Sequence, residues 1–305
     1  MKRLTERKIV LVIRETRLAN LRARFATNSQ AKFYVARLGQ DFGDYEREES
    51  TYRGAISSAQ EGLSEAGRVQ VVDRKLLPNF VFGPEDIVVV LGQDGLVANT
   101  LKYAGDLPLI GVNPDPARWD GKLLPFRVSD LKKVAADTLA GKRPYALVDM
   151  AHAKLNTGTE LFAVNDLFIG VRSHASARYR ITAGKKSEDH SSSGVIVSTG
   201  LGSTGWYTSL ITGAAAIAGT KPPPAAFAWD SGELRFTVRE PFPSKTTGTS
   251  IVTGKVTRQS PLTIESYMGE GGVIFSDGIE SDFLEFNSGT KATINLAKRR
   301  GRLVN

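Results

Sequence analysis

Residues 88–101 read VVVLGQDGLVANTL, and Asp94 is the side chain in this run that could do chemistry. It lies between Gly92 and Gly95, directly after an apolar run. Glycines let a main chain turn sharply and approach a phosphate closely, and a helix that begins there points its N-terminus at the anion. A carboxylate at such a point could orient or deprotonate a substrate hydroxyl. A plain Asp-Gly turn is the alternative interpretation.

Two further polar clusters interrupt apolar segments. Asn165-Asp166 breaks the run LFAVNDLFIGV, and this pair predicts either an Asx turn or bulge, or two side chains aimed at the ribose hydroxyls of a ligand. Residues 191–210 place a loop rich in glycine and hydroxyl groups between an apolar strand and a helix-like segment. The aromatic ring of Trp206, just inside that helix, could stack on a base. Because hydrophobic structure brackets the loop tightly, a nucleotide cradle is favoured over a flexible Ser/Gly loop.

The residue types exclude several other chemistries. The chain has no cysteine, so disulfides, thiolate metal sites and a cysteine nucleophile are excluded. Its three histidines, His152, His174 and His190, are not spaced as zinc ligands. A serine-hydrolase site is also excluded, because Ser203 lacks the G-x-S-x-G frame of such a nucleophile.

Composition indicates a globular protein of two domains. The chain has 305 residues, of which 41% are hydrophobic and 24% charged. Its net charge of +8 suits phosphorylated ligands, although a basic but ordinary soluble protein gives the same balance. We find no nucleic-acid motif beside the basic C-terminus and no apolar run of membrane-spanning length. We therefore expect a cytoplasmic protein without a nucleic-acid or membrane partner.

Strands and helices that alternate along the first half must position Asp94. Apolar runs predict strands over residues 9–13, 68–77, 86–92 and 107–113. Helix-like patterns fall over residues 30–37, 49–66, 96–104 and 129–140. This alternation favours βαβ units and a parallel sheet that is covered on both faces.

The pattern changes near residue 145. From there, short segments alternate apolar and polar residues, as in ELRFTVRE (233–240), which is typical of antiparallel sheets with one buried face. We therefore predict an N-terminal doubly wound, Rossmann-like α/β domain and a C-terminal antiparallel β-sandwich domain. Their boundary is expected at residues 141–145.

Taken in order, the three polar clusters resemble the motifs of the NAD kinase family. Gly92–Gly95 is similar to the family's Gly-Gly-Asp-Gly, Asn165-Asp166 to its Asn-Glu or Asn-Asp, and Leu201–Trp206 to its Thr-Gly-Ser-Thr-Ala-Tyr-like loop. Asp277-Gly278 also has a counterpart, and the resemblance covers roughly residue 86 to the C-terminus. Residues 111–123 and the SSSG before the third motif resemble the mitochondrial-type branch.

The resemblance implies an organisation and a reaction. It implies a nucleotide-binding α/β domain over residues 1–143, an NAD-binding β-sandwich domain over 144–289, and a chain end at about 290–305 that packs back on the first domain. The reaction would transfer a phosphoryl group from ATP or polyphosphate to the 2′-hydroxyl of the adenosine ribose of NAD, giving NADP. Mg²⁺ or another divalent cation would assist, and the protein would be a homodimer or homotetramer.

The resemblance also implies roles for individual residues. Asp94 would be catalytic, Asn165 and Asp166 would hold the ribose and nicotinamide side of NAD, and no residue is assigned as a resident metal ligand. The residues expected to bind the nucleotides are Gly92, Gly95, Asn113, Asn165, Asp166, Thr199, Gly202, Ser203, Thr204, Gly205, Trp206 and Ser209. Of these, the set Thr204, Gly205, Trp206 and Ser209 would lie along the adenosine.

Departures from the family motif leave two alternatives. Gln93 stands at the second glycine of the first motif, where a positive φ would strain it, and Leu96 replaces a threonine. These changes leave open a divergent kinase or a divergent, non-catalytic NAD(P)-binding regulator, and Gln93 is the feature that favours the regulator. A lipid or sugar kinase of the diacylglycerol kinase type would share the Gly-x-Asp-Gly loop, but it should lack the second and third clusters.

Overall fold

A computed structural model describes residues 3–305, and the chain divides into two compact units. The first unit comprises the residues up to Ala146 together with Arg302–Asn305, and the second comprises Leu147–Gly301. Among residues 3–305, no helix combines the length and the apolar character that crossing a membrane requires.

A seven-stranded sheet forms the centre of the first unit, with the path β2-β1-β3-β4-β19-β6 and β5 beside β4. The strands are β1 (Lys8–Ile13), β2 (Arg68–Asp73), β3 (Ile87–Leu91), β4 (Pro108–Asn113), β5 (Phe126–Arg127), β6 (Tyr145–Val148) and β19 (Gly301–Val304). The pairings among β1 to β5 are parallel, as is that of β19 with β4. β3 is buried along its whole length, because a parallel sheet with covered faces has no solvent side.

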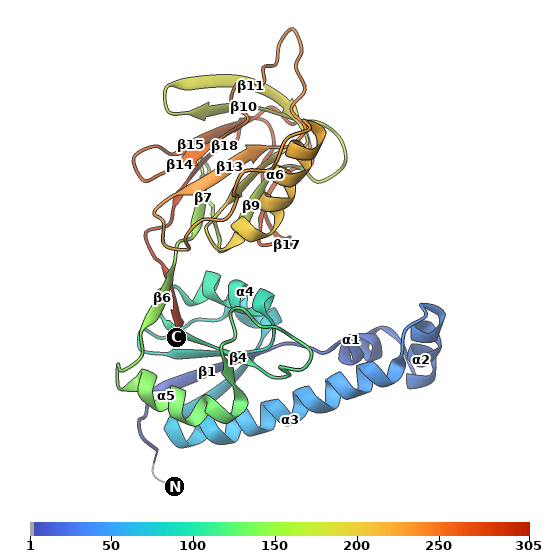
Figure 1. Cartoon of the computed structure of the whole chain (residues 1–305), viewed down its shortest axis with the longest axis vertical. Helices are drawn as coiled ribbons and strands as arrows, with labels where there is room; N and C mark the ends of the chain where they lie inside the picture. The colour runs from blue at the N-terminus through green and yellow to red at the C-terminus, as the bar shows by residue number, and fades with distance from the viewer. Residues whose placement is uncertain (1–2) are drawn as a thin grey trace. The chain divides into compact units, whose positions relative to one another are not determined.

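Helices cover both faces of this sheet (Figure 1). The helical elements are α1 (Arg17–Arg24), α2 (Asn28–Arg37), α3 (Phe42–Ala66), α4 (Asp94–Ala104), α5 (Leu131–Leu139) and the 3₁₀ turns η1 (Arg74–Asn79) and η2 (Val128–Asp130). α3 and α5 pack on one face through an apolar core that includes Leu63 and Val134, and α4 lies on the other face. The doubly wound α/β arrangement predicted from the sequence is confirmed.

Two helices begin earlier than their apolar patterns indicated. α3 starts at Phe42 rather than near residue 49, because the Asp41 side chain caps it by accepting a hydrogen bond from the Gly43 N–H at 2.9 Å. α4 starts at Asp94 rather than near residue 96, so Asp94 itself lies in the first turn of the helix.

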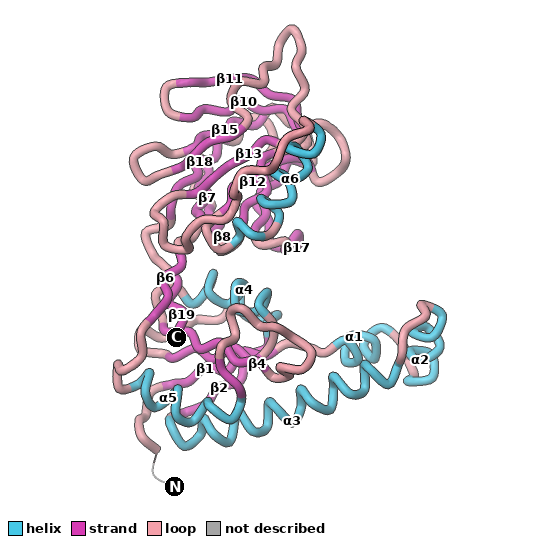
Figure 2. The backbone as a smooth tube through the Cα atoms, viewed as in Figure 1, coloured by secondary structure: helices cyan, strands magenta, loops and turns pink. Residues whose placement is uncertain are grey.

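The second unit is an antiparallel β-sandwich, which confirms the predicted fold class (Figure 2). One sheet has the order β11-β10-β15-β18-β7-β8 and the other the order β14-β13-β12-β9-β16-β17. The strands are β7 (Ala151–Leu155), β8 (Glu160–Ala163), β9 (Asp166–Val171), β10 (Ala177–Ala183), β11 (Lys186–Ser192), β12 (Val195–Ser198), β13 (Leu234–Val238), β14 (Thr253–Val256), β15 (Leu262–Ser266), β16 (Gly272–Ser276), β17 (Ile279–Glu285) and β18 (Lys291–Leu296). Alternate residues of both sheets, such as Ile169, Val197 and Ile264, share one buried core.

The outer face of the second sheet carries the helical segment of this unit. η3 (Gly202–Thr204) leads into α6 (Trp206–Ile217), and Trp206 and Leu210 of α6 pack on a small cluster that contains Phe168 and Ile196. β12 therefore ends where the glycine-rich loop begins, as its apolar run predicted.

The chain end leaves the second unit later than residue 290. Lys291–Leu296 is still strand β18, because Ala292, Ile294 and Leu296 alternate into the sandwich core. β19, which belongs with the first unit, begins at Gly301.

Candidate functional site

Asp94 is the first residue of α4, where β3 has just ended. Its carboxylate accepts hydrogen bonds from the main-chain N–H of Leu123 at 2.8 Å and of Lys122 at 3.2 Å. The loop after β4 is thereby tied to the start of α4. A negative side chain at a helix N-terminus also interacts favourably with the exposed N–H dipoles there.

The departures from the glycine motif fit this turn without strain. Gln93 has φ −123°, an ordinary extended value, so the positive φ considered for this position does not occur. Leu96 is buried at 3% exposure, and a β-carbon on Gly92 would lie 2.8 Å from its Cδ2 atom. A side chain at position 92 would therefore displace the end of the Leu96 side chain, whereas Gly95 has open space where a β-carbon would be.

Asn113, at the end of β4, uses its side chain to shape the following loop. Its Nδ2 donates to the Trp119 carbonyl at 2.8 Å, and its Oδ1 accepts from the Asp115 N–H at 3.0 Å. Arg118 of the same loop donates two hydrogen bonds to Asp44 of α3, at 2.6 and 2.9 Å. The loop that meets Asp94 is thus held at several points.

In the second unit, Asp277 organises the Asn165-Asp166 turn. Its carboxylate accepts hydrogen bonds from the main-chain N–H groups of Val164 at 3.0 Å, Asn165 at 2.6 Å and Asp166 at 3.3 Å. Asp277 has φ +56°, a left-handed conformation that is uncommon for a residue with a side chain. Asp277 and Gly278, which has φ +70°, form the two-residue turn between β16 and β17, and an Asp-Gly hairpin turn favours positive φ at both positions.

The glycine-rich loop packs directly against the same turn. The Thr199 hydroxyl donates to the Val164 carbonyl at 2.5 Å and accepts from the Gly202 N–H at 3.1 Å. A β-carbon on Gly202 would overlap the carbonyl oxygen of Asn165, so only glycine fits there. Ser203 is fully buried and donates to the Gly200 carbonyl at 2.7 Å. Thr199, Gly202 and Ser203 therefore build the loop.

These segments enclose one cavity of the second unit, of about 350 Å³. Its lining residues are Asn165, Asp166, Leu201, Gly202, Thr204, Gly205, Trp206, Asp277 and Gly278. The second and third predicted clusters are thus brought together in space. Ser209 does not line the cavity; it lies further along α6, is exposed, and donates to the Gly205 carbonyl at 3.3 Å.

Comparisons with known proteins relate this fold to solved structures. The chain resembles an NAD kinase from Archaeoglobus fulgidus in complex with ATP, with a TM-score of 0.55, 14% sequence identity, and coverage of 98% of this chain and 93% of that one. It also resembles yeast NADH kinase complexed with NADH, with a TM-score of 0.56, 13% identity, and coverage of 98% and 84%. No protein-family model matches the sequence, and neither does any curated protein. At these identities, the likeness shows a shared fold.

The electrostatic environment of Asp166 differs from that of an ordinary carboxyl group. Burial raises the pKa of Asp166 to about 7, and the neighbouring negative charge of Asp277 adds to the rise. At neutral pH the Asp166 carboxyl can therefore both accept a hydrogen bond from a ligand hydroxyl and, when protonated, donate one.

The described residues offer no cage for a metal ion. Within residues 3–305, no group of three or more His, Asp and Glu side chains is placed to hold one.

Three residues of the cavity, Leu201, Asp277 and Gly278, were not assigned to the site from the sequence. Asp277-Gly278 was matched to a counterpart in the family, but no role was given to the Asp277 carboxylate. The available signal was an Asp-Gly pair that follows the apolar run GVIF, and the same signal had pointed to Asp94.

Proposed function

We propose that this protein is an NAD kinase, which transfers a phosphoryl group from ATP or polyphosphate to the 2′-hydroxyl of the adenosine ribose of NAD. The observation that carries the proposal is the convergence of Asn165-Asp166, the glycine-rich loop and Asp277-Gly278 around one cavity. The shared fold with the archaeal NAD kinase and yeast NADH kinase supports it.

Asp94 is proposed as the catalytic carboxylate. It accepts the proton of the 2′-hydroxyl as the ribose oxygen bonds to the terminal phosphorus, while the bond from that phosphorus to the leaving oxygen of the donor breaks. ADP, or a polyphosphate shortened by one unit, leaves with the electron pair. Asp94 comes from the first unit, on a rigid helix start and a pinned loop, so its carboxylate is held in place before the substrate binds.

The cavity of the second unit is proposed to bind NAD. Asn165 and Asp166 offer an amide and a carboxyl group to ribose hydroxyls. The adenosine would lie along Gly202, Thr204, Gly205 and Trp206, which line the cavity. A divalent ion such as Mg²⁺, if bound with the donor phosphates, would supply charge neutralisation for the transferred group. The net charge of +8 favours the approach of both anionic substrates.

The proposal is tested by incubating the purified protein with NAD, Mg²⁺ and either ATP or polyphosphate, and measuring NADP with a dehydrogenase specific for it. The assay is repeated with NADH in place of NAD, and again without the divalent ion. NADP formation with at least one donor is expected, and it should stop when a chelator is added. NAD binding by calorimetry without NADP from any donor would contradict the kinase and favour the non-catalytic regulator.

A further inference from the structure

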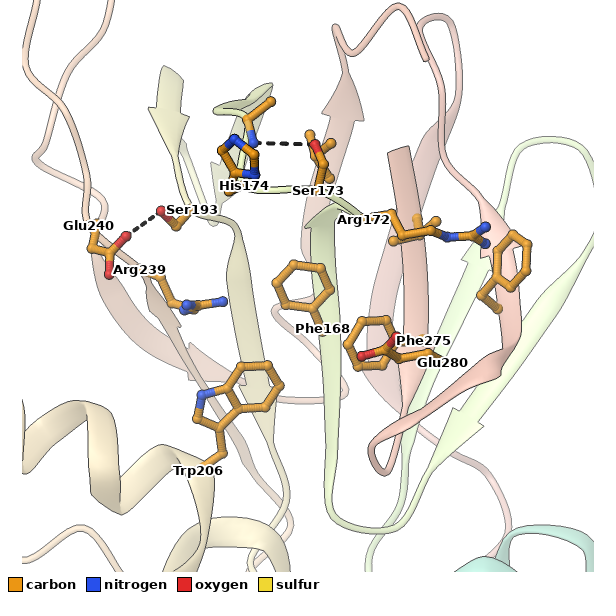
Figure 3. A pocket seen from close by; sticks show the side chains of 14 residues that line it. Phe168, Arg172, Ser173, His174, Ser193, Trp206, Arg239, Glu240, Phe275 and Glu280 are labelled. Carbon is orange, nitrogen blue, oxygen red and sulfur yellow. Dashed lines mark hydrogen bonds between the residues drawn. The ribbon is translucent and has the colours of Figure 1, made fainter. Parts of the chain in front are cut away.

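Trp206 also borders a second cavity of the second unit, of about 400 Å³ (Figure 3). Its wall is a row of three aromatic rings. Phe168 is in the middle, stacked on Trp206 with 5.9 Å between ring centroids and on Phe275 with 4.8 Å. Phe168 itself is buried at 5% exposure, whereas Trp206 and Phe275 are half-buried, so a planar ligand ring can stack on the exposed parts of these two rings.

Arg239 brings a positive charge to the same cavity. Its guanidinium carbon lies 5.4 Å from the centre of the Trp206 ring and 6.0 Å from that of Phe168. Its Nε atom is buried and has no hydrogen-bond partner among residues 3–305. A buried donor without a partner is unfavourable, so a ligand that accepts its hydrogen bond gains affinity.

Further charges define what the cavity accepts. Arg172 lies at its other side, 4.0 Å from the ring centre of Phe283. Glu240, which accepts a hydrogen bond from the Ser193 hydroxyl, and Glu280 also line it. Two guanidinium groups attract an anion, while two carboxylates disfavour a ligand with several negative charges and can accept hydrogen bonds from ring amino groups.

We propose that this cavity is a separate binding site for a nucleoside monophosphate, with the base on the aromatic row and the single phosphate paired with Arg239. The ligand is distinct from the NAD proposed above for the cavity beside Asp166, and the site does not depend on catalysis. A volume of about 400 Å³ is within the range of small-molecule sites.

The test is a calorimetric titration with AMP in the presence of saturating NAD, which fills the other proposed adenosine site. We expect one AMP to bind per chain, with adenosine and inorganic phosphate each binding at least tenfold more weakly, because each uses only half of the cavity. Arg239→Gln should raise the Kd for AMP at least tenfold. The matched control is Arg180→Gln. The wild-type Arg180 guanidinium pairs with Asp189 at the edge of the other sheet, so this variant should leave the Kd for AMP unchanged.

A second variant keeps the test informative if Arg239→Gln fails to fold. Ser193→Asp places a negative charge in the cavity and should also raise the Kd for AMP at least tenfold, with a melting temperature close to that of the wild type. No AMP binding to the wild type, an unchanged Kd in either folded variant, or inorganic phosphate binding as tightly as AMP would overturn the proposal. NADP formation is read separately, so absence of kinase activity with AMP binding intact would contradict only the proposed function.

Discussion

The carboxylate of Asp94 accepts a hydrogen bond from the main-chain N–H of Leu123, with 2.8 Å between Oδ1 and N. The same group is proposed to remove a proton from the substrate. Anchoring the loop requires a hydrogen-bond acceptor at position 94, whereas catalysis requires a base. A substitution that keeps the acceptor and removes the basicity therefore separates the two roles.

Asp94→Asn should lower kcat by roughly 10²-fold or more, because the amide keeps the size of the side chain but loses the basicity. The amide can still accept one of the two main-chain N–H groups. The free energy of unfolding should therefore fall by only about 1 kcal/mol. Kinetics of NADP formation and urea unfolding of the same preparation measure both effects. A variant with near-normal kcat and reduced stability would show that Asp94 serves only the loop.

The buried Asp166 carboxyl should make stability fall with rising pH. Its pKa of about 7 in the folded protein is above the value in the unfolded chain, about 3.9. Between these values the folded state binds more protons than the unfolded state, so this group's contribution falls as pH rises from about 4 and levels off above about 7. Asp166→Asn removes this dependence. From pH 5 to pH 8, the wild type should lose a few kcal/mol of unfolding free energy relative to the variant. An equal difference between the two proteins at both pH values would contradict the raised pKa.

Gly202→Ala should disrupt the loop, because its β-carbon would overlap the Asn165 carbonyl oxygen. The β-carbon is fixed to the main chain and the atom it meets is a main-chain oxygen, so a side-chain rotation cannot relieve the contact. We expect a loss of about 1–3 kcal/mol in unfolding free energy and weaker NAD binding. The control is Gly213→Ala in α6, where a β-carbon meets no atom within 4 Å and alanine favours the helix. Thermal unfolding and NAD calorimetry compare the two, and equal effects would contradict the close approach.

Trp206→Ala should raise the Kd for NAD about two- to tenfold, the usual range for one aromatic contact. It also removes the stack on Phe168, so some stability is lost as well. Trp206→Phe keeps an aromatic ring and should retain most of the affinity. Calorimetry with NAD distinguishes the roles: an unchanged Kd in Trp206→Ala at a lowered melting temperature would make Trp206 a packing residue only.

Local patterns determined which elements form and where the polar clusters fall along them. The apolar run of β3 predicted a buried strand, and the glycines around Asp94 predicted the turn into a helix, because strand burial and helix starts depend on neighbouring residues. The cap at Asp41 is equally local, but the apolar pattern of α3 does not begin there, and so the helix start was placed too late.

Tertiary structure alone decided which distant groups meet. The carboxylate of Asp277 binds the N–H groups of Val164, Asn165 and Asp166, which are 111 to 113 residues away in the chain. Gly202 packs against Asn165, which is 37 residues earlier in the chain. Arg239, which follows the end of β13, lies beside the ring of Trp206. Strand pairing and packing of the two sandwich sheets fix these contacts, and no periodicity within a short window carries that information.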